Sequence, residues 1–203
     1  MTVGIVDYDA GNLTSVENAL RHLGYRWIVS GDPKVLQDTD RLVFPGDGHA
    51  ATSMENLRAR GLDRLLTEYV AGGRPVLGIC VGSQIVLDSS QEGSARCLGL
   101  IPGTCLKLPG GPELKVPHMG WNSVHFEGTH PLTADIPQDS SFYFVHSYYT
   151  VPEPSVTVLG TTDHGLRFVV GFVQRNLATW QFHPEKSGEV GLKLVDNFLK
   201  WRP

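Results

Sequence analysis

The chain has 203 residues, 41% of them hydrophobic and 19% charged, and this balance predicts one folded domain over residues 1–203 rather than a disordered chain. Its formal net charge of -4 provides no strong positive field, so nucleic acid is not an expected partner. The sequence has no run of about 18 apolar residues and no basic leader at its start, so we expect neither membrane insertion nor secretion.

The first half of the chain alternates short apolar runs with helical patterns. The runs at 3–6, 41–44 and 75–79 predict strands buried on both faces. Apolar residues spaced at i, i+3, i+4 and i+7 predict helices over 14–23 and 62–70, each followed by glycine. Strands and helices in this order build a mostly parallel sheet covered by helices, in which functional sites lie at the carboxyl ends of the strands.

The second half is richer in glycine, proline and aromatic residues. Its short runs at 141–145, 156–159 and 168–172 predict strands, which we expect to continue the same sheet in antiparallel fashion. A final helix is expected over about 188–201. The predicted fold class is therefore α/β, with a mostly parallel central sheet flanked by helices and an antiparallel extension.

The cysteines are Cys80, Cys97 and Cys105, and they lack the close spacing of a zinc or redox pair. We therefore expect a cytoplasmic protein without a metal site. Cys80 stands apart because it lies within the sequence GICVGSQ at 78–84, after a buried strand and before a helical pattern. This is a thiol version of the nucleophile elbow, in which small neighbours allow a tight turn and the helix start favours the thiolate. Taken alone, a small buried core cysteine is the competing interpretation.

A second candidate is the pair His183 and Glu185, separated by Pro184. Residues two apart on an extended segment point to the same side, and proline places the pair at a strand end. A carboxylate that orients an imidazole supplies the general base that a cysteine nucleophile requires. Without the elbow, a surface pair with no chemistry would be the simpler interpretation.

Taken together, the segments 78–84 and 183–185 resemble the class I, or triad, glutamine amidotransferases. Within that class the chain is similar to the glutaminase subunits of imidazole glycerol phosphate synthase. This similarity extends from about residue 3 to 198 and rests on four further segments, namely YDAGN at 8–12, PHMGWN at 117–122, YFVHSY at 143–148 and QFHPEKS at 181–187. The resemblance implies a flavodoxin-like fold and one amidotransferase domain.

The resemblance also implies a mechanism without a cofactor. Cys80 attacks the side-chain amide of glutamine, His183 moves the protons and Glu185 holds His183. Oxyanion donors are implied at the backbone of Val81 and at the segment carrying Gly46 and Asp47. The residues implied to bind the substrate are Gly48, Gln84, Glu92, Tyr143, Ser147 and Tyr148, with Glu92 facing the ammonium group of glutamine.

A (β/α)8-barrel cyclase subunit is the partner that the resemblance implies, in a heterodimer that passes ammonia from one subunit to the other for histidine biosynthesis. The residues implied at this interface are Asn12, His118, Trp121 and Lys186. Tryptophan is common at binding hot spots, although burial in the core is the alternative for Trp121.

The chain departs from the family pattern at Asp47, where an apolar residue is usual, and at Ser83, where methionine is common. Because Asp47 brings a charge close to the expected oxyanion, we expect its side chain to point away if the site is active. Three other functions stay open at this level. They are a glutaminase subunit for another barrel synthase of amino-sugar type, a non-catalytic binding subunit, and a cysteine peptidase or amidase, which the PHMGWN segment weakens.

Overall fold

The computed structural model describes residues 1–9, 13–111 and 114–203. Its main sheet has a parallel half whose strands lie in the order β2, β1, β3, β4 and β14. All residues of β3, β4 and β14 are buried, as expected for strands covered on both faces. The bounds are β1 Thr2–Val6, β2 Arg26–Ser30, β3 Arg41–Gly46, β4 Val76–Cys80 and β14 Leu177–Trp180.

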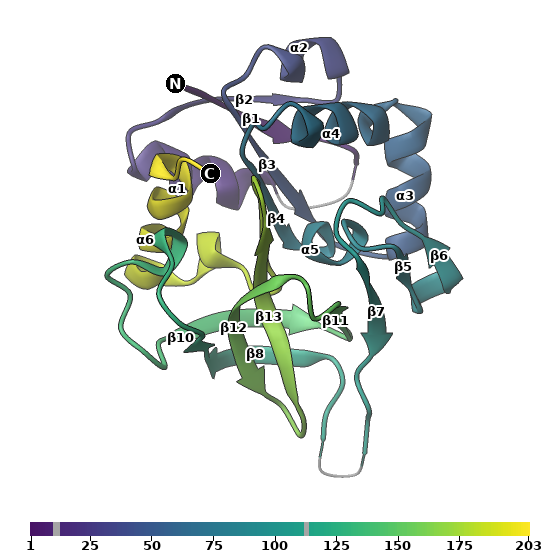
Figure 1. Cartoon of the computed structure of the whole chain (residues 1–203), viewed down its shortest axis with the longest axis vertical. Helices are drawn as coiled ribbons and strands as arrows, with labels where there is room; N and C mark the ends of the chain where they lie inside the picture. Colours follow the sequence, from purple (N-terminus) through teal and green to yellow (C-terminus); the bar gives the residue numbers. More distant parts are fainter. Residues whose placement is uncertain (10–12, 112–113) are drawn as a thin grey trace.

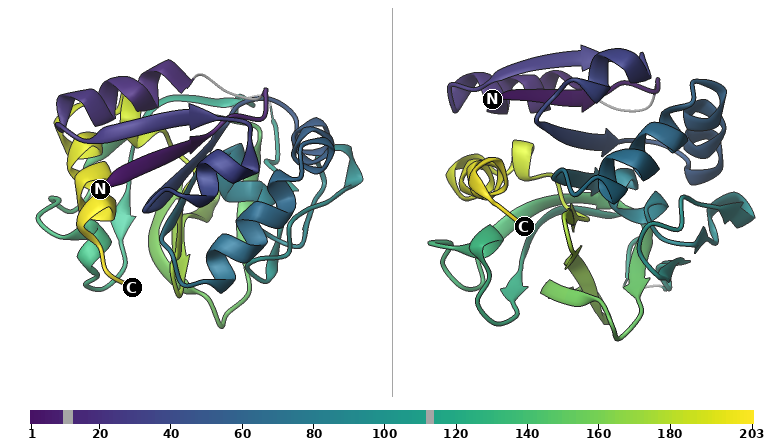
Figure 2. Two further views of the ribbon diagram at one scale, coloured as in Figure 1. Left: turned by 90° about the horizontal axis from the view of Figure 1, so that it is seen from above. Right: turned by 45° about the horizontal axis from the view of Figure 1, so that its top comes forward.

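Helices cover both faces of these strands, with α1 and α6 on one side and α3 and α4 on the other (Figures 1 and 2). The predicted C-terminal helix is present as α6, which buries Leu194, Val195 and Phe198. The short α2 begins with Pro33, and the side chain of Asp32 accepts a hydrogen bond from the amide of Lys34. The bounds are α1 Leu13–His22, α2 Pro33–Gln37, α3 Ala50–Ala59, α4 Leu62–Ala71, α5 Val81–Ile85 and α6 Gly188–Lys200.

The sheet continues from β14 through β13, β11 and β7, and these three junctions are antiparallel as predicted. Beyond β7, the short strand β5 pairs in parallel and β6 follows it, while β12 lies against β13 and β9. The bounds are β5 Ser89–Ser90, β6 Ala95–Arg96, β7 Gly103–Lys107, β9 His125–Phe126, β11 Tyr148–Pro152, β12 Thr157–Asp163 and β13 Arg167–Gln174, with single 3-10 turns η1 at Glu92–Ser94, η2 at Pro131–Thr133 and η3 at Pro184–Lys186.

One predicted strand lies outside this sheet. Strand β10 (Ser141–His146) pairs with β8 (His118–Ser123) in a separate antiparallel pair, so the expectation that 141–145 extends the main sheet is wrong. The cause is the alternation along β10, which buries Phe142 and Phe144 while their neighbours stay accessible. Both rings pack on Phe182, at centroid distances of 4.3 and 5.5 Å, so β10 stacks its apolar face on the chain after β14.

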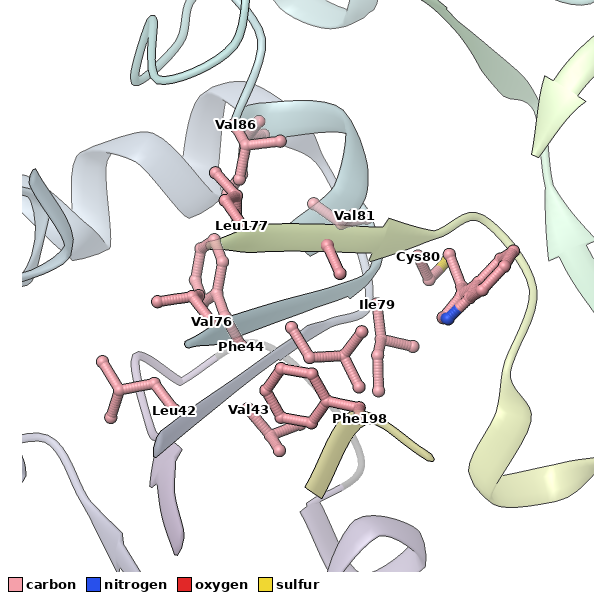
Figure 3. Packing of buried hydrophobic residues seen from close by; sticks show 14 of the residues in the cluster. Leu42, Val43, Phe44, Val76, Ile79, Cys80, Val81, Val86, Leu177 and Phe198 are labelled. Carbon is pink, nitrogen blue, oxygen red and sulfur yellow. The ribbon is translucent and has the colours of Figure 1, made fainter. Parts of the chain in front are cut away.

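The apolar core lies around the parallel strands, where Val43, Phe44, Val76 and Ile79 pack with Phe198 of α6 (Figure 3). Cys80 lies at the end of this core, directly beside the carboxyl end of β3, because Gly46 pairs with Cys80 in the β3–β4 ladder. Strand β14 runs parallel to β4 and also ends at this edge. The described part of the chain contains no helix with the length and hydropathy needed to cross a membrane.

Candidate active site

Cys80 occupies a strained turn between β4 and α5. Its backbone has φ 53° and ψ -112°, a combination that residues with a side chain rarely adopt. The thiol-bearing side chain lies at the wall of a cavity and is 4% exposed. Such a turn presents the residue at the carboxyl edge of the sheet, where the first amides of α5 have no partner within the helix.

The flanking glycines are required by close packing in this turn. A Cβ on Gly82 would collide with the carbonyl oxygen of Phe44, and one on Gly78 would lie 2.9 Å from the carbonyl oxygen of Gly82. Backbone therefore packs directly on backbone around the nucleophile candidate. The Gly-x-Cys-x-Gly pattern follows from these contacts, because any larger residue would push α5 away from β3 and β4.

His183 and Glu185 are brought together as a buried pair. His183 Nδ1 lies 2.7 Å from Glu185 Oε1, and both side chains are 3% exposed. The pair does not follow an extended strand, as the spacing predicted, because Pro184 starts the single turn η3 directly after His183. The amide of His183 donates to the carbonyl of Tyr143 on β10, and the Ser187 hydroxyl donates to the carbonyl of His183, so the main chain at His183 is held on both sides.

The electrostatics of His183 favour a charged imidazolium. Burial opposes the charge, but the neighbouring Cys80 and Glu185 outweigh it and raise the pKa of His183 to about 10. Nε2 is buried and makes no hydrogen bond to the described residues, and Cys80 is the first of the neighbours that raise the pKa of His183. The arrangement can therefore hold a thiolate beside an imidazolium, which is the reactive state of a cysteine nucleophile.

A cavity of about 400 Å³ opens in front of Cys80. Most residues assigned to substrate from the sequence line it, whereas His183 and Glu185 do not and Tyr143 lies outside it, with its ring 6.5 Å from that of His183. The lining residues are Asp47, Gly48, Cys80, Val81, Gln84, Glu92, Pro117, Val145, His146, Ser147, Tyr148 and Lys186. Sequence reasoning did not single out Pro117, Val145 or His146, although all three lie in or beside the segments that carry the resemblance.

Two polar residues of the cavity already have protein partners. Glu92 Oε2 accepts a 2.7 Å hydrogen bond from the amide of Ala50, the first residue of α3. Gln84 Nε2 donates to the carbonyl of Tyr148 at 3.1 Å and to Gln181 Oε1 at 3.0 Å. Both side chains are thus held in place at the cavity wall.

The segment expected to hold an oxyanion donor lies next to Cys80. Gly46 is buried, and a Cβ there would collide with the hydroxyl of Tyr8. Gly48 has φ 97°, which a residue with a side chain would adopt only with strain. Asp47 between them lines the cavity, and its charge adds to the effects of burial and Cys80 in raising the pKa of Tyr8. The carboxylate therefore belongs to the electrostatic environment of the site, and the expectation that its side chain points away from the oxyanion stays a prediction.

The four residues assigned to a partner interface differ in exposure. Trp121 on β8 is 60% exposed, so it is not a core residue, and the neighbouring Met119 is 62% exposed. Lys186 lies at the cavity wall. His118 is only 4% exposed and offers a partner little surface, and Asn12 lies outside the described residues.

His118 belongs instead to a buried imidazole chain. His118 Nδ1 lies 2.9 Å from His146 Nε2, and His146 Nδ1 lies 2.8 Å from the carbonyl oxygen of Tyr148. At the other end, Asn122 Nδ2 lies 3.2 Å from His118 Nε2. Burial, aided by the nearby His164, lowers the pKa of His118 to about 4, and burial lowers the pKa of His146 to about 3 against the opposing bond to Tyr148. Both rings are neutral at pH 7.

These two histidines predict acid sensitivity of the fold. Their pKa values are lower in the folded chain than the ordinary 6.5, so the unfolded chain binds more protons below pH 6.5. The stability they contribute is present above pH 6.5 and is lost as the pH falls towards 4. The free energy of unfolding measured in urea should be lower at pH 5 than at pH 7, and His118→Gln should make this difference smaller. The exposed His22→Gln is the control, and equal losses in wild type and His118→Gln would contradict the assignment.

The comparisons with known proteins cover almost the whole chain. The family model described as glutamine amidotransferase class-I matches residues 4–201. Proteins named imidazole glycerol phosphate synthase subunit HisH are 44% identical in Dehalococcoides mccartyi, over 98% of this chain and 96% of the relative, and 44% identical in Methylococcus capsulatus, over 100% and 97%.

Among solved structures, PurLQS from Thermotoga maritima aligns with a TM-score of 0.74 at 18% identity, over 98% of this chain and 97% of that chain. A glutamine amidotransferase from the same organism aligns with a TM-score of 0.68 at 17% identity, over 98% and 81%. These structures support the fold alone, because their sequence identities are low.

Proposed function

The chain belongs to the class I glutamine amidotransferases and, within them, to the HisH subunits of imidazole glycerol phosphate synthase, and from this premise we propose that Cys80, His183 and Glu185 form its catalytic triad. Its activity is that of a glutaminase in histidine biosynthesis. The observation that best supports the triad is the strained Cys80 turn placed beside a buried His183–Glu185 pair with a 2.7 Å contact.

In the first step the Cys80 thiolate attacks the carboxamide carbon of glutamine. The negative charge that develops on the amide oxygen is stabilised by the backbone amide of Val81 and by an amide of the segment 46–48, where each donor is worth about 2.7–4 kcal/mol. The His183 imidazolium donates its proton to the departing nitrogen, the carbon–nitrogen bond breaks and ammonia leaves. A glutamyl thioester remains on Cys80.

In the second step His183, now neutral, accepts a proton from water as the water oxygen attacks the thioester carbonyl. The carbon–sulfur bond breaks, Cys80 leaves as a thiolate and glutamate is released. Glu185 keeps Nδ1 of His183 occupied, so that Nε2 faces the reacting atoms in both steps. Around the cavity, Glu92 faces the ammonium group of the substrate, and Gly48, Gln84, Ser147 and Tyr148 complete its walls.

The relatives are named as subunits of a synthase, so this chain works within a complex. The partner we propose is a (β/α)8-barrel cyclase in a cytoplasmic heterodimer, docked over β8, where Met119 and Trp121 leave apolar surface exposed. Lys186, at the cavity wall, is a further interface residue in this proposal. Ammonia released at Cys80 then passes to the barrel without entering bulk solvent.

The experiment that tests this function measures glutamate release by the chain alone, with the barrel subunit, and with the barrel subunit plus its nucleotide substrate. We expect the isolated chain to be slow and the full complex to be roughly 10² to 10³ times faster, because docking completes one oxyanion donor. An isolated chain that is as fast as the full complex would exclude activation through the 46–48 segment.

Asp47 provides a separate test of that segment. A carboxylate close to the developing oxyanion raises the barrier, so Asp47→Val and Asp47→Asn should both increase the basal glutaminase rate by about threefold to tenfold. Basal glutamate release is the measurement, and the asparagine variant serves as the control for shape. If only the valine variant responded, side-chain size rather than charge would limit the basal rate.

A further inference from the structure

Gln181 is the residue that the proposed mechanism does not yet use. It follows β14, is 1% exposed, and its Nε2 lies 3.9 Å from Cys80 Sγ, within the longer range of hydrogen bonds to sulfur. Its backbone amide is bonded to the carbonyl of Val170 at 2.7 Å, so the main chain is fixed at this position. Gln181 does not line the cavity, and it therefore approaches the sulfur from within the protein.

The orientation of the Gln181 amide is dictated by its neighbours. A backbone carbonyl only accepts hydrogen bonds, so Gln84 must present its Nε2 to the carbonyl of Tyr148. The same Nε2 reaches Gln181 at 3.0 Å, so Gln181 must present Oε1 to Gln84. Its remaining amide group, Nε2, then faces Cys80 as a donor. The carbonyl of Tyr148 thus determines the direction of the hydrogen bonds from Gln84 to Gln181 and from Gln181 to Cys80.

We propose that Gln181 is a catalytic residue of the glutaminase reaction that donates a hydrogen bond to Cys80 Sγ and favours the thiolate. This inference rests on the proposed role of Cys80 as the nucleophile. Gln181 transfers no proton and forms no bond to substrate. It stabilises the sulfur anion before attack and again when the carbon–sulfur bond of the thioester breaks and the electron pair returns to sulfur, because a hydrogen bond to a charged acceptor is stronger than one to a neutral acceptor.

A neutral donor in this position has an advantage over a second cation. His183 must lose and regain its charge during the reaction, so its stabilisation of sulfur varies between steps. The Gln181 amide stays neutral throughout, and its hydrogen bond with Gln84 prevents it from rotating away. The contact therefore persists through both steps, whatever the protonation state of His183.

Gln181→Met is the variant that tests this role, because it keeps the length of the side chain, introduces no charge and removes the donor. We measure the alkylation of Cys80 by iodoacetamide as a function of pH in the full chain, with the modified peptide identified by mass spectrometry. We expect the alkylation rate of Cys80 at pH 7 to be about tenfold lower than in wild type. The midpoint of the pH dependence of alkylation should be higher by up to about one pH unit. With the barrel subunit bound, kcat should fall by a similar factor and KM for glutamine should stay within about twofold, because Gln181 lies outside the cavity.

Asn197→Leu is the matched control. Asn197 lies on α6, outside the cavity, and it is another buried side-chain amide. Its Nδ2 donates to the carbonyls of Leu132 and Ala134. It should lower stability and leave the alkylation profile unchanged. If Gln181→Met does not fold, Gln181→Leu is measured in its place. A profile that coincides with wild type in the folded variant would overturn the role of Gln181. Glutamine hydrolysis by Cys80→Ala would instead reject the nucleophile itself, so the two failures are distinguishable.

Discussion

Cys80→Ala is expected to lower glutamine turnover by about 10⁴-fold or more, because no other group of the site can form the thioester. The fold should persist, since Cys80 is a small residue at the edge of the core and alanine adopts φ 53° no less readily than cysteine does. Glutamate release in the complex with the barrel subunit measures the loss. Urea unfolding measures stability, which should change by about 1 kcal/mol or less.

The other two cysteines provide the control for this result. Burial raises the pKa of Cys97 to about 11 and raises that of Cys105 further, so both are protonated thiols at pH 7. Cys97→Ala and Cys105→Ala should therefore retain activity. A Cys97→Ala protein that folds but is as inactive as Cys80→Ala would show that the nucleophile has been assigned to the wrong thiol.

His183→Ala should reduce turnover by roughly 10⁵-fold and Glu185→Gln by roughly 10³-fold, because the imidazole moves the protons whereas the carboxylate only orients and charges it. Glu185 helps to raise the pKa of His183, so Glu185→Gln should also shift the loss of the His183 proton to lower pH. The measurement is the pH profile of kcat/KM in the complex for both variants.

The test depends on which of the two variants, His183→Ala or Glu185→Gln, loses more turnover. His183→Gln serves as the control for shape, because it keeps a polar side chain at the position and supplies no base. A larger loss in Glu185→Gln than in His183→Ala would contradict these roles, and full activity in both variants would remove the triad altogether.

Strands β1, β3 and β4 of the parallel core could be predicted because they are continuous apolar runs, whereas α3 and β2 were missed for identifiable reasons. Helix α3 buries Ala50, Ser53, Met54 and Leu57, which have helical spacing, but two of these residues are too small or polar to reveal it. Strand β2 lies at the edge of the sheet, and its residues are exposed or only partly buried, so its apolar run at 27–29 is only three residues long and is flanked by Arg26 and Ser30.

Some features of the site are likewise determined by neighbouring residues in the sequence, and others only by the tertiary fold. The turn at Cys80 is encoded locally, because the glycines that it requires lie within two residues. The exposure of Trp121 and the burial of His118 depend on how β8 packs with β10 and on the stacking of Phe144 and His164 on His118, which no local pattern records. The donor role of Gln181 depends on Gln84 and Tyr148, which are distant in sequence, so it becomes visible only in the fold.

The central claim is that Cys80 carries the glutamyl group, and covalent labelling with an electrophilic glutamine analogue tests it most directly. The account predicts one label per chain, located on the peptide that contains Cys80, with the label slowed by added glutamine and its formation matched by the loss of glutaminase activity. A label on Cys97 or Cys105, or undiminished hydrolysis by a chain fully labelled at Cys80, would contradict it.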